Sequence, residues 1–585
     1  MKVSDVVADF LIHNGINTVF GIIGSANSHL YDSFVKSGIH IYNVHHEQCA
    51  VMAAGAYYRT CGKLAVALVT AGGGATNSVT GIVGLWADSV PTIILSGQES
   101  SGYVREHSDR RMYGTQGLDI VHMVSKVTKY AKVLDADTVQ DELEKALFIS
   151  TRGRKGPVLL DVPFDVQSKD VQVRLWNECV HHLKSPSDVE IETVKKLLSE
   201  AKRPVILGGH GISNSRKEFD FFLQSVRAPV LLTWSAIDVL DHGNPLFFGS
   251  PGVYGQRAAN FILQKCDLLL VIGSRLTLPQ TGYDMKEFAR GAKVVMVDVD
   301  PSEFKDFVDV SVHADCGEFL RKIQVSYANE EWLSECASIK SEFPLVDYFH
   351  ADTEFPNSYK MVDAISGHLK PDQVIVTDMG TALLSGHQGI RLKAGHTMFS
   401  SYGLGEMGYG LPAAFGAAIA GNGREVLCLN CDGSMMMNLQ ELQTIIQHKL
   451  RVKIVVFNND GYLMIKHTQK MLFKGKYTAV NSDTGIVLPD YMKIAEAFGY
   501  EKFQIKNWDE FNFYFRRFMD FDGPSICEIF MPPEQEFLPK VKGVLKTDGS
   551  IFAPPLEEMS PVLPFETIQR IMGTQLSSKS KGIVR

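Results

Sequence analysis

The sequence lacks the signals that mark a secreted protein. Residues 1–5 begin an amphipathic pattern at once, without the apolar block of a signal peptide. The nine cysteines are scattered and odd in number, which does not suit a disulfide framework. We therefore expect a reduced, cytoplasmic protein.

Basic runs are also missing. Lysine and arginine total 58 against 66 aspartate and glutamate residues, so the formal net charge is −8. Proteins that bind nucleic acid neutralise phosphates with clustered lysine and arginine. Nucleic acid is therefore not an expected partner.

Long apolar runs are scarce. Residues 64–87 contain no charged residue and are long enough to span a bilayer. Gly72, Gly73, Gly74 and Asn77 interrupt the run, which predicts a buried strand, a tight turn and a helix of small residues instead. No membrane association is expected.

Short apolar runs that alternate with helical patterns are abundant. A chain of 585 residues is too long for one core. The alternation predicts an α/β fold with three doubly wound parallel-sheet domains. Their expected ranges are 1–175, 189–345 and 355–540, followed by a surface arm over 541–585 with a helix at 565–572 and disorder from 577.

Asp432 and Asn459 each follow an apolar run, 425–430 and 452–457, and a helical pattern separates the runs. Such a crossover makes the two strands parallel, so both end at one edge of a sheet. A carboxylate, an amide oxygen and the backbone carbonyl of Gly461 suit Mg²⁺ that is held mainly by a ligand's phosphates. An isolated Asp-Gly pair is more often a plain turn.

The spacing points beyond a plain turn. Asn459 follows Asp432 by 27 residues, with strand, helix and strand between them. This arrangement resembles the diphosphate-binding motif of the thiamine diphosphate-dependent enzymes. Cys431 stands where that family has its first glycine, which is a departure.

Glu47 lies in the segment His45-His46-Glu47-Gln48-Cys49-Ala50. A lone glutamate at a helix start is usually a partner of the helix dipole. This segment, however, resembles the family's His-Glu-x-x-Ala, whose glutamate contacts the pyrimidine ring of thiamine diphosphate. The resemblance implies that Glu47 is catalytic.

The resemblance implies further site residues. Residues 70–77, 87–91 and 96–98 look like family segments, and 403–410 resembles the acetohydroxyacid (acetolactate) synthase segment whose methionine, here Met407, wedges the cofactor into its bent shape. Gln98 and Gln116 are implied as catalytic. The other implied contacts to thiamine diphosphate are Gly24, Asn77, Gly380, Thr381, Gly405, Gly433, Ser434, Gly461, Tyr462, Leu463 and Met464.

The middle unit resembles the flavin-binding domain of the acetolactate synthases. Its turns follow predicted strands, and glycine there permits the close approach of a phosphate. The turns match no dinucleotide fingerprint, and loop closure explains them as well. The resemblance implies an FAD site at Gly208, Gly209, Thr233, Gly273, Arg275, Asp298 and Asp315.

Several departures bear on the substrate. Thr468 stands where a tryptophan selects the acceptor in acetolactate synthases, Phe164 replaces a lysine, and Gly117 replaces a glutamate. The resemblance implies decarboxylation of pyruvate and transfer of the two-carbon unit to a carbonyl acceptor, such as a ketone or keto sugar. Acetolactate formation from two pyruvates is the alternative reaction. A third possibility is that the protein binds the cofactor without catalysis and serves as a structural partner. A homodimer or homotetramer is implied.

Overall fold

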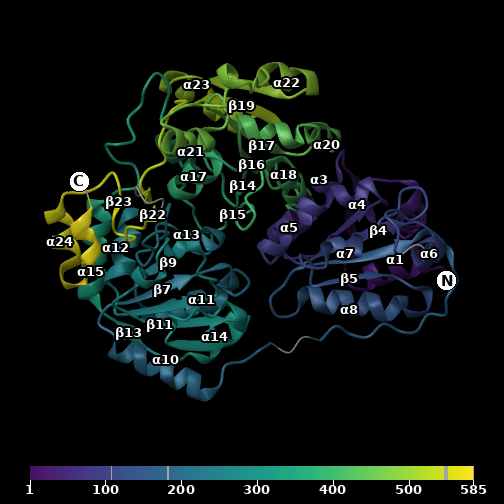
Figure 1. Ribbon diagram of the computed structural model, residues 1–585, viewed down its shortest axis with the longest axis horizontal. Coiled ribbons are helices and arrows are strands. Elements are labelled where there is room, and N and C mark those ends of the chain that lie inside the picture. The colour runs from purple at the N-terminus through teal and green to yellow at the C-terminus, as the bar shows by residue number, and fades with distance from the viewer. Residues whose placement is uncertain (107–108, 181–182, 546–550, 584–585) are drawn as a thin grey trace. The chain divides into compact units, whose positions relative to one another are not determined.

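The computed structural model describes residues 1–106, 109–180, 183–545 and 551–583. The chain divides into two compact units. The first comprises Met1–His181, Asp372–Leu383 and Thr397–Pro533, and the second comprises His182–Pro371, Leu384–His396 and Glu534–Arg585. Figure 1 labels the elements.

The first unit contains two six-stranded parallel sheets. The N-terminal sheet has the order β2-β1-β3-β4-β6-β5. Its middle strands are buried on both faces, as expected of parallel sheets covered by helices. The strands are β1 (Thr18–Gly21), β2 (His40–Asn43), β3 (Val66–Val69), β4 (Thr92–Gln98), β5 (Tyr130–Val133) and β6 (Pro157–Pro163), with helices α1 (Val3–His13), α2 (Ser28–Lys36), α3 (Glu47–Cys61) and α8 (Val139–Thr151).

The uncharged stretch 64–87 folds as predicted. It forms β3, then α4 (Gly73–Asn77) and α5 (Val79–Ala87). Among the described residues, no helix has the length and apolarity needed to cross a membrane.

The second sheet of the first unit has the order β15-β14-β16-β17-β19-β18. Asp432 and Asn459 adjoin the ends of two neighbouring parallel strands, as predicted. The strands are β14 (Val374–Thr377), β15 (Thr397–Phe399), β16 (Val426–Cys431), β17 (Val452–Asn458), β18 (Glu501–Ile505) and β19 (Ser525–Phe530), with helices α18 (Gly410–Ala420), α20 (Glu441–Gln447), α21 (Leu463–Phe473), α22 (Tyr491–Phe498) and α23 (Trp508–Asp520). Helix α17 (Thr381–Gly389) begins in the first unit and belongs to the second from Leu384 onward.

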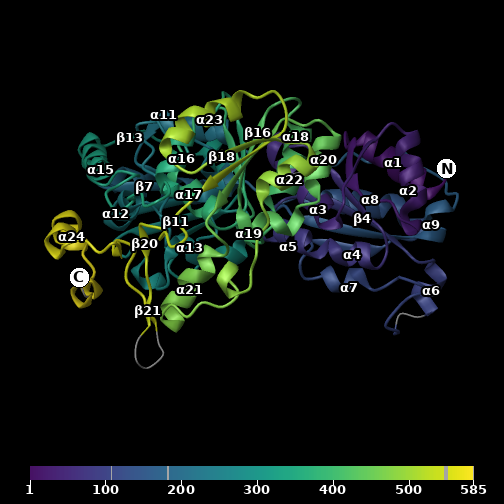
Figure 2. The same cartoon turned by 90° about the horizontal axis from the view of Figure 1, so that it is seen from above.

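The small-residue helix α3 packs against α18, and Figures 1 and 2 show the two side by side. A Cβ on Gly416 of α18 would lie 2.1 Å from the carbonyl oxygen of Ala53 in α3. Backbone contact of this kind requires glycine. Residues of both helices belong to one buried apolar cluster, so this contact lies within a single chain.

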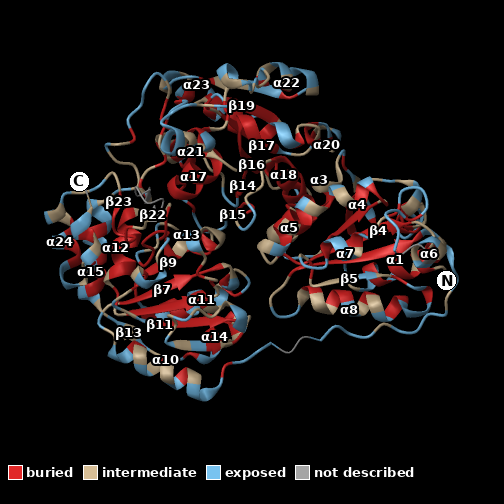
Figure 3. Cartoon of the chain, viewed as in Figure 1, coloured by how far each residue is buried: buried red, intermediate tan, exposed pale blue. Residues whose placement is uncertain are grey.

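The second unit contains a five-stranded parallel sheet with the order β12-β11-β10-β7-β9. Figure 3 shows its strands as mostly buried. The strands are β7 (Pro204–Gly208), β9 (Val230–Leu232), β10 (Leu268–Ile272), β11 (Lys293–Asp298) and β12 (Val310–His313), with helices α10 (Asp188–Glu200), α11 (Arg216–Ser225), α12 (Arg257–Lys265), α14 (Cys316–Lys322), α15 (Glu330–Glu342) and α16 (Ser358–Ser366).

The C-terminal segment differs from the expected arm. The predicted helix forms as α24 (Phe565–Met572). Leu556 and Met559 are buried in the core of the second unit, and Ser577 and Ser580 are also buried. The expectation of disorder is therefore wrong for residues 577–583, because two of their serines are buried and Lys579 pairs with Asp284.

The α/β class with three parallel sheets is confirmed. The boundaries between three separate domains stay a prediction. Two of the nine cysteines, Cys428 and Cys431, have the C-x-x-C spacing that is typical of metal-binding and redox motifs. Both lie on β16, three residues apart, so they point to opposite faces of the sheet, and both are free buried thiols.

Candidate active site

Glu47 lies at the carboxyl edge of the N-terminal sheet, where it begins α3 after β2. Its Oε2 accepts a 3.0 Å hydrogen bond from the side-chain amide of Asn77, at the end of α4. A Cβ on Gly74 would stand 3.1 Å from the other carboxylate oxygen. The structure therefore brings together two predicted residues that are 30 positions apart, and glycine keeps space open beside the carboxylate.

Gly24, Gln98 and Gln116 lie at the same sheet edge. The amide of Gln98 donates to the Leu118 carbonyl and to Asp161 Oδ2, both at 2.8 Å, and its carbonyl accepts from the Glu99 N–H. These bonds tie the end of β4 to Asp161 on β6 and to the loop at Leu118. This arrangement indicates a positioning role rather than direct contact with a substrate.

The neighbouring loop positions are held by backbone contacts. The backbone N–H of Gln116 donates to Glu99 Oε1 at 2.8 Å, and its side chain is exposed. The N–H of Gly24 donates to Asn27 Oδ1, and a Cβ on Gly24 would collide with Thr70. Gln116 is therefore more available to a ligand than Gln98.

Asp432 is fully buried at the edge of the second sheet. Its Oδ2 accepts from the N–H groups of Asn459 at 3.0 Å and Gly461 at 2.9 Å, and its Oδ1 accepts from Gly433. The Asn459 amide in turn donates to the Gly461 carbonyl at 2.7 Å. The three predicted metal ligands thus form one hydrogen-bonded cluster.

This cluster fits Mg²⁺. It presents a carboxylate, a side-chain amide oxygen and a backbone carbonyl, which are the hard oxygen donors that Mg²⁺ prefers. Burial raises the pKa of Asp432 to about 7. A divalent cation supplies the positive charge that favours the ionised carboxylate in such a site.

Asp378, which the sequence analysis did not single out, fixes the glycine-rich loop. It follows β14 and accepts hydrogen bonds from the N–H groups of Gly408 at 3.1 Å and Gly410 at 2.7 Å. Burial raises its pKa to about 6. Met407 lies inside this tethered loop, and Gly405 has a φ of +70° that favours glycine.

The remaining predicted contacts surround the metal cluster. Thr381 donates its hydroxyl to Asn459 Oδ1 at 2.9 Å, and Ser434 donates to Asn430. A Cβ on Gly433 would lie 2.4 Å from the ring of Tyr462. Gly380 lies beside Cys431, and Leu463 and Met464 open α21 after the metal loop.

A buried cation beside the metal loop was also missed. Lys466 is 1% exposed, and its ammonium donates to the carbonyls of Asn459 at 3.3 Å and Pro533 at 3.2 Å. Lys466 lies in an amphipathic helix, where a lysine is normally expected on the exposed face, so the sequence alone does not predict that it is buried. Its position indicates that it holds the loop rather than reacts.

The seven residues assigned to FAD lie at the ends of strands of the second unit's sheet or in the turns that follow those strands. Gly208, Gly209 and Gly273 lie at its carboxyl edge, where open α/β sheets bind ligands. A Cβ on Gly209 would stand 2.4 Å from the Gly273 carbonyl oxygen, so packing between the two turns already requires glycine. Asp315 caps α14, and Asp298 accepts from the Asp300 N–H. Thr233 and Arg275 complete the set.

Comparison with known proteins identifies the family. Thiamine pyrophosphate enzyme models match at residues 1–123 (N-terminal TPP binding domain), 191–323 (central domain) and 378–529 (C-terminal TPP binding domain). The chain is 29% identical over 543 residues to the acetolactate synthase isozyme 2 large subunit of Escherichia coli (strain K12), covering 91% of this chain and 97% of that protein.

Two further relatives are similar over comparable lengths. The acetolactate synthase large subunit of Cyanidium caldarium is 30% identical over 560 residues, covering 91% of this chain and 94% of its own length. Acetolactate synthase 2, chloroplastic, of Zea mays is 30% identical over 569 residues, covering 92% and 87%. This chain therefore belongs to the acetolactate synthase-like, thiamine pyrophosphate-dependent carboligases.

Proposed function

We propose that the enzyme decarboxylates pyruvate and transfers the resulting two-carbon unit to a carbonyl acceptor. The observation that carries this proposal is the pair of polar clusters, Glu47 with Asn77 and Asp432 with Asn459 and Gly461. The two clusters match the two ends of one coenzyme: a ring that accepts a hydrogen bond and a diphosphate that carries Mg²⁺.

The residues have distinct roles in this proposal. Glu47 would bind the pyrimidine ring of the coenzyme, and Asn77 fixes the orientation of the Glu47 carboxyl. Asp432, Asn459 and the Gly461 carbonyl would hold Mg²⁺, and the loop tethered by Asp378 would place Met407 against the bound coenzyme. Bound thiamine diphosphate supplies the electron sink for loss of CO₂ from a 2-oxo acid.

The acceptor separates two candidate reactions. Thr468 and Gly117 stand in place of residues associated with a second small 2-oxo acid, and this supports a ketone or keto sugar. The acetolactate synthases among the relatives support condensation of two pyruvates equally well. Incubation with pyruvate alone, and then with a panel of ketones and aldehydes, read by mass spectrometry, distinguishes the two reactions. Rapid acetolactate formation without added acceptor favours the second.

We also propose FAD at the carboxyl edge of the second unit's sheet. The support is the resemblance to acetolactate synthases and the polar groups gathered at that edge. Purified protein should show flavin absorption in the visible region, and denaturation should release the flavin. A colourless preparation that takes up no added FAD contradicts this part.

We propose a homodimer or homotetramer in the cytoplasm, in which Glu47 of one chain serves the Asp432 site of another. Within one chain, Glu47 is hydrogen-bonded to Asn77, whereas Asp432 is hydrogen-bonded to the backbone of residues 459–461. Mixing Glu47→Gln with Asp432→Asn subunits tests the arrangement. Restored turnover, which neither variant shows alone, requires sites that are shared between chains.

A further inference from the structure

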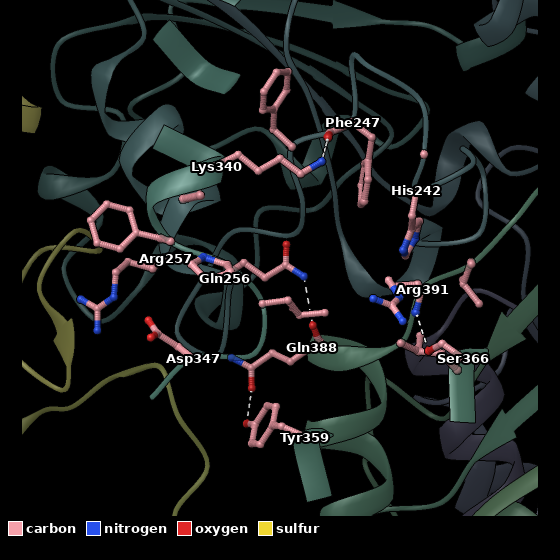
Figure 4. A pocket seen from close by; sticks show the side chains of 18 of the residues that line it. His242, Phe247, Gln256, Arg257, Lys340, Asp347, Tyr359, Ser366, Gln388 and Arg391 are labelled. Carbon is pink, nitrogen blue, oxygen red and sulfur yellow. Dashed lines mark hydrogen bonds between the residues drawn. The ribbon is translucent and has the colours of Figure 1, made fainter. Parts of the chain in front are cut away.

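A cavity of about 490 Å³ lies within the second unit, away from every residue assigned above. Segments from several elements enclose it: the loop 241–248, the start of α12, the end of α15, the segment 343–349, and residues 388–393 (Figure 4). Its volume falls in the range of small-molecule sites, roughly 300–1,000 Å³. All its lining residues belong to one compact unit.

One wall of the cavity is aromatic. His242 stacks on Phe247 with ring centroids 4.5 Å apart. Phe248 and Phe343 add further apolar surface. Burial lowers the pKa of His242 to about 4, so its ring is neutral near pH 7 and behaves as part of this flat wall.

Lys340 brings a positive charge to this wall. Its ammonium lies 5.6 Å from the ring centroids of both Phe247 and Phe248, and it donates to the Phe247 carbonyl at 2.6 Å. Lys340 forms no ion pair with a carboxylate in the described part of the chain. The residue is exposed to solvent, and partial burial lowers the pKa of its ammonium.

The other charges leave the cavity positive. Four cationic side chains line it, Arg257, Lys340, Arg391 and Lys393, against Asp241 and Asp347, and Arg391 is ion-paired with Asp363 at 2.9 Å. Asp241 keeps its negative charge, because the N–H groups of Gly243 at 2.7 Å and Ala394 at 3.0 Å stabilise the ionised carboxylate and lower its pKa. The buried Arg257 binds backbone carbonyls of the C-terminal segment.

Polar groups on the opposite side are fixed in place. Gln388 accepts from the Tyr359 hydroxyl at 2.5 Å, and its amide donates to the carbonyls of Gly255 and Pro539. Gln256 donates to the Gln388 carbonyl at 3.0 Å, as Figure 4 shows. A preformed site of this kind costs little reorganisation when a ligand enters.

We propose that this cavity binds a small organic anion with a flat apolar body, such as an aryl carboxylate, sulfonate or phosphate ester. The ring lies against the Phe247–His242 wall, and the anionic group pairs with the Lys340 ammonium. The site is separate from the thiamine diphosphate clusters and from the flavin edge, because none of the residues assigned to those sites lines it.

The test uses the enzyme loaded with thiamine diphosphate, Mg²⁺ and FAD, so that those sites are filled. 1-Naphthalenesulfonate and the matched cation 1-naphthylmethylammonium are titrated by calorimetry. The wild-type enzyme should bind the anion at least tenfold more tightly than the cation. Equal binding of the two, or no binding of either, overturns the proposal.

Charge reversal locates the site. Lys340→Glu should reverse the preference, so that the cation binds more tightly, while Lys196→Glu, at an exposed position of α10, should leave it unchanged. A collapse of the cavity would weaken both probes together and would not reverse their order. Thermal unfolding of both variants checks folding. Unchanged anion binding by a folded Lys340→Glu variant, or displacement of bound FAD by the naphthalenesulfonate, refutes a separate site.

Discussion

The side-chain amide of Asn77 donates a 3.0 Å hydrogen bond to the Glu47 carboxylate across 30 residues of sequence. Glu47→Gln should reduce turnover about 10²–10⁴-fold, the range for removal of a group that transfers protons. Asn77→Ala should cost less, because it removes only the orienting bond. Steady-state decarboxylation of pyruvate measures both, and equal losses in the two variants would contradict this division of roles.

Changing the cluster of Asp432, Asn459 and Gly461 should weaken the binding of Mg²⁺ and thiamine diphosphate without unfolding the protein. Asp432→Asn removes the carboxylate, so Mg²⁺-dependent binding of thiamine diphosphate should weaken at least tenfold in calorimetry. The matched control is Asp460→Asn, next to the cluster, exposed, and at a positive φ that asparagine tolerates. Similar binding by Asp432→Asn and Asp460→Asn would show that the metal lies elsewhere.

The Asp378 tether predicts a loosened loop. Asp378→Ala removes the hydrogen bonds to the N–H groups of Met379, Gly408 and Gly410. At about 1 kcal/mol each, the free energy of unfolding should fall by about 3 kcal/mol. Proteolysis should then cut within residues 403–410 faster than in the exposed control Asp509→Ala. Equal cleavage rates would rule out the tether.

Asp161 gives a pH dependence. Burial raises its pKa to about 7, against an ordinary value of 3.8. Between these values the native state keeps a proton that the unfolded state has lost, so this group lowers stability as pH rises through that window. Asp161→Asn should therefore be more stable than wild type above pH 7, by about 4 kcal/mol, with the gain vanishing near pH 4. Metal-free thermal melts at pH 5 and pH 8 measure the difference. A gain that is equal at both values contradicts the shift.

The sequence predicts central strands better than edge strands. β7, β10 and β17 are near-continuous apolar runs, because parallel strands are covered on both faces. The strands that the pattern did not reveal include β5, β12, β15 and β18, which all lie at sheet edges and are partly exposed. β19 is central and buried, but Glu528 interrupts its apolar run.

The parts of the candidate site that lie in short sequence motifs were predictable from the sequence. Asp432, Asn459 and Glu47 stand at fixed points of recognisable segments, so their places at sheet edges followed from the strand–helix–strand order. Asp378, Asp161 and Lys466 act on segments up to 67 residues away in sequence. Only the fold shows which backbone groups those side chains reach, so no local pattern could reveal them.

Glu557 near the end of the chain is fully buried and pairs with Arg290, at 2.5 Å, in the same core that receives Leu556 and Met559. Until residues 556–559 have left the ribosome, that core is open, and Arg290 has Glu287 but not Glu557 as a counter-charge. The second unit therefore completes its core only after residues 556–559 have emerged, whereas the first has all its strands by Phe530. A nascent chain stalled before residue 556 should present a half-built domain to chaperones.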